Sequence, residues 1–266
     1  MGGLGDYPSD LNEVLYRLIY HRSYRDLFVS DPHELKLDAE TTANLFAIDR
    51  EELMGTARRV RQNVLTGDGV AGGLTRSYSM VFSILADLGV RNDDVAEAFM
   101  ESECFRDFHD LPFVGTGITL EEAFYEFLSG DEHGLPTTDG LTLWLQHEFL
   151  TALTSLMVLN PDPNFVWRTP LVRHNGVANY AVVRYPAAFI GRLAKRAWDG
   201  ESPDSLYLYA SGTSGLVTGP ISEVAGAIIE RGSMRPEEYN VDTALNIEPN
   251  QSSALANQLR QLGLLE

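Results

Sequence analysis

The sequence contains a single cysteine, Cys104, among its 266 residues. One cysteine excludes an intramolecular disulfide framework and any zinc cluster built from cysteines, and a reducing cytosol is the simplest compartment. No segment combines a charged start, an apolar run and a small-residue cleavage site, and no apolar run approaches the roughly 20 residues that span a bilayer. We therefore expect a soluble, cytoplasmic protein without a membrane partner.

Basic residues are also scarce, because 20 Lys and Arg face 38 Asp and Glu, which gives a formal net charge of −18. A strongly acidic chain repels phosphate backbones, so general nucleic-acid binding is disfavoured. The charge is uneven, however. Residues 168–200 hold six basic residues and one acid, whereas residues 1–167 hold 11 basic and 28 acidic residues. Residues 201–266 are acidic again, with three basic and nine acidic residues.

Intact catalytic motifs are lacking as well. The segment 67–72 matches the glycine spacing of a dinucleotide-binding loop, but a predicted helix precedes it and no P-loop lysine follows, so we interpret it as a connector. The segment 212–215 is one residue short of a nucleophile elbow and fits a hairpin turn. His147-Glu148 starts a zinc-protease motif that fails at Thr151. We predict no catalytic residue and no cofactor.

A metal-dependent enzyme is nevertheless an alternative. His109, His133 and His147 could act as ligands together with nearby carboxylates. These histidines come from three separate segments, so their spacing by itself assigns no site.

Helical periodicity dominates the first two-thirds of the chain. Asp10, Asp49 and Thr119 each precede an apolar helical stripe as predicted N-caps, and another helix is expected from Asp38 to Ala47. Single helices are expected over 74–89 and about 93–108, and a long apolar helix over 142–159. A glycine-rich connector at 67–73 and the segment 160–164 mark boundaries. We predict a helical domain at 1–66, a helical bundle at 74–160 and an α/β domain at 165–266.

A short unit occurs twice near the C-terminus, at 177–196 and 205–231. At an offset of 35, Phe189 aligns with Val224 and Gly191 with Gly226. Each copy predicts a strand followed by a helix. Leu171 is also predicted in a strand, and helices are expected at 240–247 and 251–262. The fold class is therefore α+β: a helical N-terminal two-thirds, then a strand–helix repeat with a winged-helix-like end.

The first copy of the repeat overlaps the basic block and is the strongest candidate binding site. A cationic strand edge could capture an extended acidic peptide by β-addition. The same residues could instead neutralise the acidic N-terminal half across a domain interface, and nucleic-acid binding is the third reading. The predicted peptide-binding residues are Arg168, Arg173, Tyr180, Val182, Arg184, Tyr185, Arg192 and Arg196.

The order of hydrophobic segments also carries a family resemblance. The N-terminal and middle segments concerned are 15–18, 27–28, 31–32, 45–49, 53, 58–59, 102, 105–106, 121–124, 127–128 and 147–149, followed by the strand–helix module. Together they resemble accessory partner proteins of multinuclear non-heme iron-dependent oxidases in the biosynthesis of ribosomal peptide natural products. The resemblance implies a non-catalytic subunit that binds the iron-dependent oxidase and presents a precursor or leader peptide to it.

A winged-helix transcriptional regulator is the remaining alternative. The acidic balance of residues 201–266 disfavours it, because a recognition helix needs cationic contacts with phosphates.

Overall fold

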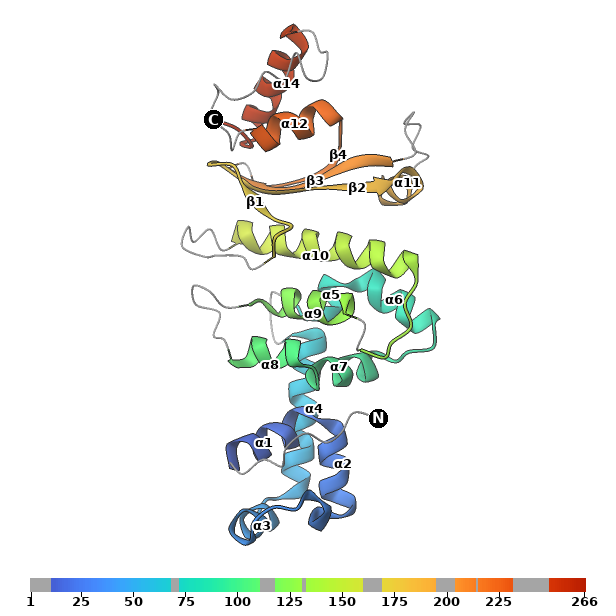
Figure 1. Cartoon of the computed structure of the whole chain (residues 1–266), viewed down its shortest axis with the longest axis vertical. Coiled ribbons are helices and arrows are strands. Elements are labelled where there is room, and N and C mark those ends of the chain that lie inside the picture. The colour runs from blue at the N-terminus through green and yellow to red at the C-terminus, as the bar shows by residue number, and fades with distance from the viewer. Residues whose placement is uncertain are drawn as a thin grey trace. The chain divides into compact units, whose positions relative to one another are not determined.

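The computed structural model describes residues 11–67, 72–110, 118–130, 133–159, 169–194, 204–213, 215–231 and 249–266. Helices fill the N-terminal two-thirds, and a four-stranded antiparallel sheet with further helices follows, which confirms the α+β class (Figure 1). The chain divides into two compact units. We name Met1–Pro112 with Thr119–Leu141 the helical unit, and Phe113–Ile118 with Thr142–Glu266 the sheet unit. The division into three domains stays a prediction.

Helices alone build the described part of the helical unit. They are α1 (Leu11–Tyr20), α2 (Arg22–Ser30), the 3-10 helix η1 (Pro32–Leu35), α3 (Ala39–Phe46), α4 (Arg50–Thr66), α5 (Leu74–Ser77), α6 (Ser79–Asp87), α7 (Asn92–Met100), α8 (Glu103–Asp110) and α9 (Leu120–Ser129).

Two of the predicted N-caps, Asp49 and Thr119, are confirmed, and Asp38 is a further N-cap. The carboxylates of Asp38 and Asp49 each accept two backbone N–H groups at the starts of α3 and α4. Thr119 and Glu122 form a reciprocal capping box at the start of α9. Asp10 lies outside the described residues.

Two predicted helices are wrong as single helices. The first is interrupted at Tyr78, where φ is −126° and ψ is 44°, so that α5 and α6 are separate. The second is interrupted at Ser102, whose Oγ donates to the Phe99 carbonyl and accepts from the Phe105 N–H. A serine side chain can replace helical backbone bonds in this way, ending α7 and starting α8.

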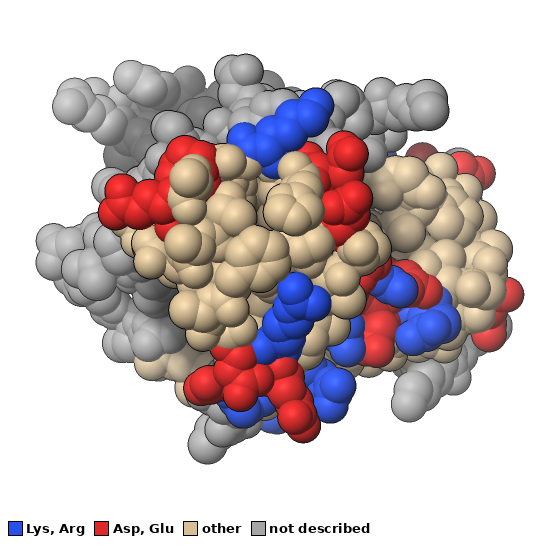
Figure 2. All heavy atoms as spheres, turned by 90° about the horizontal axis from the view of Figure 1, so that it is seen from below, with Lys and Arg blue, Asp and Glu red and all other residues tan. Residues whose placement is uncertain are grey.

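Two groups of side chains form the interior of the helical unit. One apolar cluster joins α1, α2, η1, α3 and α4, and it contains Val14, Leu18, Tyr24, Phe28, Leu35, Leu45 and Leu53. The other group is aromatic: Phe82 and Phe124 stack with ring centroids 5.6 Å apart, and Phe99 meets Phe124 edge-on at 5.2 Å. Viewed from below, the surface carries acidic and basic side chains in mixed groups around an uncharged area (Figure 2).

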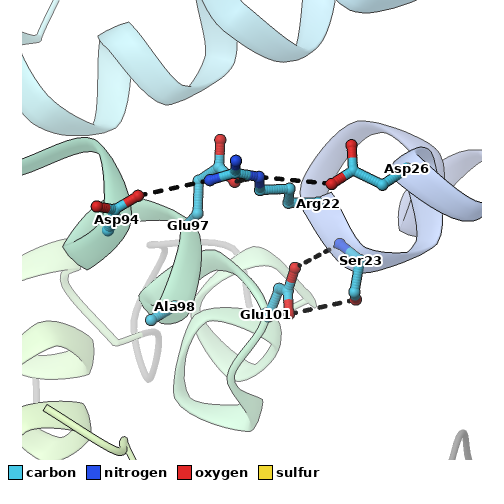
Figure 3. Close-up of a pocket in the computed structure, with 7 residues that line it drawn as sticks. All are labelled: Arg22, Ser23, Asp26, Asp94, Glu97, Ala98 and Glu101. Carbon is cyan, nitrogen blue, oxygen red and sulfur yellow. Dashed lines mark hydrogen bonds and ion pairs between the residues drawn. The ribbon is translucent and has the colours of Figure 1, made fainter.

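A buried charge cluster joins three helices of this unit. Glu97 of α7 is 6% exposed and hydrogen-bonds Arg61 of α4. Its carboxylate also lies 3.7 Å from Arg25 Nη2 and 3.4 Å from Arg22 Nε, both on α2, and Figure 3 shows Glu97 beside Arg22. Arg25 is itself buried and donates to the Ile19 carbonyl at 2.8 Å. Sequence spacing contained no signal for this cluster, because its members are up to 75 residues apart.

The sheet unit has a helix–sheet–helix arrangement. Its elements are α10 (Asp139–Leu159), whose first residues belong to the helical unit, β1 (Arg173–His174), β2 (Asn179–Pro186), α11 (Ala187–Ala194), β3 (Asp204–Gly212), β4 (Gly215–Ile221), α12 (Glu223–Arg231) and α14 (Pro249–Gln261). The strands run in the order β1-β2-β3-β4, all antiparallel. Helices α10 and α11 cover one face, and α12 and α14 cover the other (Figure 1).

The strand–helix repeat is confirmed as two successive units: α11 follows β2, and α12 follows the β3–β4 hairpin. The two repeat helices lie on opposite faces of the sheet. Phe189 of α11 packs on Tyr185 with ring centroids 5.0 Å apart. Gly226 of α12 approaches the other face so closely that an added Cβ would lie 2.9 Å from Leu206 Cδ1.

The other C-terminal predictions have mixed outcomes. The predicted helix at 251–262 is confirmed as α14, whereas the one at 240–247 lies outside the described residues. Leu171 is in a turn rather than a strand. Among the described helices, none combines the length and the hydropathy that crossing a bilayer requires.

Candidate functional site

The predicted strand-edge surface lies on β2, which is paired only in part on its outer side. Strand β2 pairs with β3 along all eight of its residues, whereas β1 pairs only with Asn179 and Tyr180, so no described strand lies beside residues 181–186 on the β1 side. Tyr180 is buried beneath α12 and α14, and Val182 packs against the same cluster. Tyr185 is buried on the opposite face, against Phe189. Because helices cover both faces of the sheet, the side chains of Tyr180 and Tyr185 are buried in the core, and a peptide-binding role for the edge of β2 stays a prediction.

Arg184 of the first repeat and Arg173, which precedes this repeat, pair with the second repeat. Arg184 of β2 forms an ion pair of 2.7 Å with Glu223, and Arg173 of β1 forms one of 3.1 Å with Glu230. Both glutamates belong to α12, one at each end of the helix. The cationic copy is therefore neutralised in part by the acidic copy. These pairs are exposed, so each contributes little to stability and can exchange for an acidic ligand.

The remaining predicted binding residues are placed differently. Arg192 on α11 is exposed, and its guanidinium lies 5.4 Å from the centre of the Phe189 ring. Arg168 and Arg196 lie outside the described residues. A peptide-binding role for Arg173, Arg184 and Arg192 stays a prediction.

Strand β4 is the long edge strand of the sheet. It pairs with β3 over all seven of its residues, and no other described strand lies on its outer side. The opposite edge strand, β1, has only two residues. The hairpin that delivers β4 turns at Gly212–Gly215, as predicted, and Gly215 has the positive φ of 103° that such a turn requires.

The register shows which backbone groups of β4 point outward. Pro220 lies opposite Tyr207. Proline has no N–H, so within a sheet its nitrogen is found facing an open edge. Along an antiparallel strand, the backbone N–H and C=O groups of every second residue point to the same side. The backbone groups of Thr218 and Leu216 therefore point outward, as those of Pro220 do. The side chain of Leu216 is 43% exposed and adds an apolar contact beside this edge.

A hydrogen-bonded chain of three side chains crosses the interior of the sheet unit. His147 Nδ1 on α10 lies 2.5 Å from Tyr209 Oη on β3, and Tyr209 donates to the Tyr185 hydroxyl at 3.1 Å. Trp144, Phe189 and Tyr207 surround the imidazole. Burial lowers the pKa of His147 to about 4 and raises the pKa of Tyr209.

We expect the stability of the sheet unit to fall as the pH is lowered from 7 to 5. The unfolded chain takes up a proton on His147 near pH 6.5, whereas the folded chain resists protonation down to about pH 4. This difference removes about 2 kcal/mol from the free energy of unfolding over the interval. Urea titrations at pH 5, 6 and 7, followed by tryptophan fluorescence, measure it, because all three tryptophans lie in residues 142–266.

The control for this experiment is His147→Gln, which keeps a side-chain donor and does not titrate. Its stability should vary less between pH 7 and pH 5 than that of the wild type. Equal pH dependence in both proteins would show that other groups cause the loss.

The other candidate metal ligands have neighbours of a different kind. His109 lies 3.1 Å from an Asp110 oxygen and packs edge-on against Tyr16 and Tyr20. His133 accepts the Leu135 N–H through Nδ1 at 2.9 Å. Within the part of the chain that the structure describes, no three His, Cys, Asp or Glu side chains lie close enough to hold a metal ion. Both histidines belong to the helical unit, and His147 belongs to the sheet unit.

The sequence interpretation missed two features: the open edge of β4 and the contact between His147 and Tyr209. Pro220 inside an otherwise strand-like segment was an available signal for the first, because proline is confined to edges and bulges. Nothing local signalled the second, since the two residues are 62 positions apart. No protein-family model, curated protein or solved structure matches this chain.

Proposed function

We propose that the chain is a non-catalytic partner subunit that binds an extended precursor peptide along the outer edge of β4 and presents it to a peptide-modifying, iron-dependent oxidase. The observation that carries the peptide-binding part is the open, seven-residue edge of β4. The oxidase partner rests on the resemblance drawn from the order of hydrophobic segments.

The backbone of β4 supports peptide addition in a specific register. Thr218 and Leu216 each offer an outward N–H and C=O, and Pro220 offers only a C=O. An added peptide strand can thus form backbone hydrogen bonds with β4 from the turn as far as Thr218. At Pro220, β4 offers it no N–H donor. Main-chain hydrogen bonds supply affinity in this mode, and alternate side chains supply specificity.

The composition of β4 also supports this role. Natural edge strands are commonly protected by charged side chains or by proline. The sequence of β4, GLVTGPI, has no charged residue, and its proline lies near one end. The end near the turn is therefore unprotected against an added strand.

Arg184 gives the site its preference for acidic residues. Its partner Glu223 lies two positions after the last residue of β4. An acidic side chain of the peptide near Ile221 competes with Glu223 for this guanidinium. This extends the predicted role of Arg184 from β2 to the end of β4.

The decisive variant is Thr218→Pro. Proline at this position removes one outward N–H and leaves the bonds between β3 and β4 intact, as Pro220 already does. Peptides selected on the wild-type protein from a random display library should bind this variant at least about tenfold more weakly, the loss expected for one or two hydrogen bonds. Isothermal titration with the selected peptides gives the affinities.

Thr218→Ala is the matched control, because it loses the side-chain hydrogen bond to Tyr207 but keeps the backbone N–H. It should bind the selected peptides as the wild type does. Equal affinity of the proline and alanine variants would refute peptide addition at β4. Sedimentation analysis covers another occupant: a wild-type dimer that Thr218→Pro dissociates would mean that a second copy of the chain fills the edge.

The oxidase partner is tested separately by co-purification with the products of genes adjacent to its own. An iron-dependent oxidase should be retained by the wild type. If peptides bind at β4 but no oxidase is retained, the oxidase part of the proposal is wrong and the peptide-binding part stands.

A further inference from the structure

Strand β4 presents its side chains alternately to the two helical layers of the sheet unit. Its residues alternate between half-buried and exposed along the whole strand. Val217 and Ile221 belong to the half-buried set, and both pack on the apolar cluster beneath α12 and α14. Because every second residue of a strand points to the same face, Gly219 lies on this face too, between Val217 and Ile221. The α12–α14 face of β4 is therefore apolar on both sides of a glycine.

The space above Gly219 on this face is open. Apart from its chain neighbours, no described residue has a heavy atom within 4 Å of a Cβ added to Gly219. The partner of Gly219 on β3 is Leu208, which is buried in the same cluster. We name this space the Gly219 gap. Val217 and Ile221 bound it along β4, Leu208 bounds it towards β3, and its outer side is the open edge of the sheet.

The helices of this layer come close to the sheet elsewhere. Gly226 of α12 lies over the far end of β3, since a Cβ added to it would lie 2.9 Å from Leu206 Cδ1. The turn after α14 lies over Gly212, where an added Cβ would lie 2.6 Å from the Gly263 carbonyl oxygen. Both places exclude even a methyl group, whereas the Gly219 gap admits one without contact. The helical layer thus covers the two ends of the β3–β4 pair more tightly than the gap.

An added strand places one of its residues directly opposite Gly219. All strand pairs of this sheet are antiparallel, and antiparallel pairing is slightly the more stable kind. The outward backbone groups of β4 belong to Leu216, Thr218 and Pro220, so an antiparallel peptide forms no hydrogen bonds at Gly219 itself. Cα atoms in such a pair are only about 4.5 Å apart, and both side chains point to one face. The peptide side chain opposite Gly219 can therefore enter the gap.

The boundaries of the gap favour an aromatic side chain. All three are aliphatic, and Val217 and Ile221 are β-branched. Aromatic rings pair favourably with β-branched residues on neighbouring strands, and they bury a large apolar area. Glycine in a strand has no side chain to pack and marks a place where another chain approaches closely, and an aromatic ring on the adjacent strand can cover it.

We propose that the Gly219 gap takes a phenylalanine, tyrosine or tryptophan of the bound peptide and so determines which peptides bind. The inference rests on the proposed addition of a peptide strand to β4, and it names the class of peptide. In an antiparallel strand, the residues after the aromatic one lie opposite Thr218, Val217 and Leu216 in turn. The aromatic residue thus stands at the N-terminal end of the segment that pairs with β4, because Pro220 offers no N–H beyond it.

The test uses peptides that are selected on the wild-type protein and weakened by Thr218→Pro. We expect these peptides to share one aromatic residue. Its replacement by alanine should weaken binding about tenfold in isothermal titration, because an aromatic ring leaves an apolar contact. A peptide with phenylalanine at this position should shift the Gly219 Hα resonance upfield through its ring current. Cyclohexylalanine has a similar volume but no ring current, so its peptide should not cause this shift.

Val217→Ala and Leu216→Ala are matched variants, because the two residues are neighbours on opposite faces of β4. Val217→Ala removes one boundary of the gap. The aromatic-to-alanine replacement in the peptide should therefore cost about three- to fivefold less affinity in this variant than in the wild type. In Leu216→Ala the replacement should cost as much as in the wild type. Both peptides are compared on the same protein, so a change in the stability of a variant affects them equally.

Four results would overturn the inference and leave peptide addition at β4 intact. The selected peptides could share no aromatic residue, or alanine at that position could leave the affinity unchanged. The phenylalanine and cyclohexylalanine peptides could shift the Gly219 resonance alike, or the two protein variants could reduce the cost of the replacement equally. If instead Thr218→Pro leaves the affinity of every selected peptide unchanged, peptide addition itself is wrong and the inference is wrong with it.

Discussion

Glu97→Gln should destabilise the helical unit by about 3 kcal/mol, the loss expected when one partner of a buried ion pair is removed. Glutamine keeps the volume of the side chain and removes its charge. Arg25 would stay buried without its counter-charge, and burial already lowers the pKa of its guanidinium while Glu97 opposes that effect. Arg61 would lose its hydrogen bond to the Glu97 carboxylate.

Urea unfolding followed by hydrogen exchange of the amides in α2, α4 and α7 measures this loss. Asp94→Asn is the matched control, because Asp94 pairs with Arg22 and Arg91 in partly exposed positions. It should change the free energy of unfolding by less than about 0.5 kcal/mol. If both variants lose the same small amount of unfolding free energy, solvent screens the arginines around Glu97 and the charge cluster is not buried.

Gly212→Ala should destabilise the sheet unit by about 2–4 kcal/mol. An added Cβ at this position would lie 2.6 Å from the Gly263 carbonyl oxygen and 3.1 Å from its carbon. Both are backbone atoms, so no flexible side chain can move aside. The C-terminal segment must shift away from β3, which would withdraw Leu259 and Leu264 from the cluster that they share with Leu208 and Ile229.

Urea titration followed by tryptophan fluorescence measures the stability, and hydrogen exchange at residues 259–264 locates the change. Gly140→Ala is the control substitution, because its nearest neighbour would be Thr138 Oγ1 at 3.9 Å. In the first turn of α10 it should be neutral or stabilising by up to about 1 kcal/mol. A Gly212→Ala protein as stable as this control would mean that the C-terminal segment does not pack on β3 as described.

The helix starts of this protein could be predicted from the sequence because capping is local. Asp49 and Thr119 act on backbone groups within three residues of themselves. The strand–helix repeat was equally visible, since period-2 and helical patterns need no distant contact. The interruption of the predicted helix at Ser102 was missed, because only the structure shows that the serine hydroxyl replaces helical backbone hydrogen bonds.

The binding surface could not be derived from the same pattern. Tyr180 and Tyr185 have the composition of an aromatic contact surface, but helices on the two faces of the sheet bury both side chains. Strand order depends on pairings between distant segments, and local alternation does not encode it. Among the described strands, β4 has an open edge along its whole length, in the uncharged part of the second repeat, and residues 181–186 of β2 are open beyond the short strand β1.

The sequence by itself determined the α+β class, the confirmed helix caps and the two strand–helix units, because each depends on residues that are neighbours in the chain. Only the tertiary structure decided that Arg184 and Arg173 pair with Glu223 and Glu230, that His147 reaches Tyr209, and that Glu97 collects three arginines. These contacts join residues 36 to 75 positions apart. The charge or polarity of a residue is visible in the sequence, but the distant residue that it pairs with in the folded chain is not.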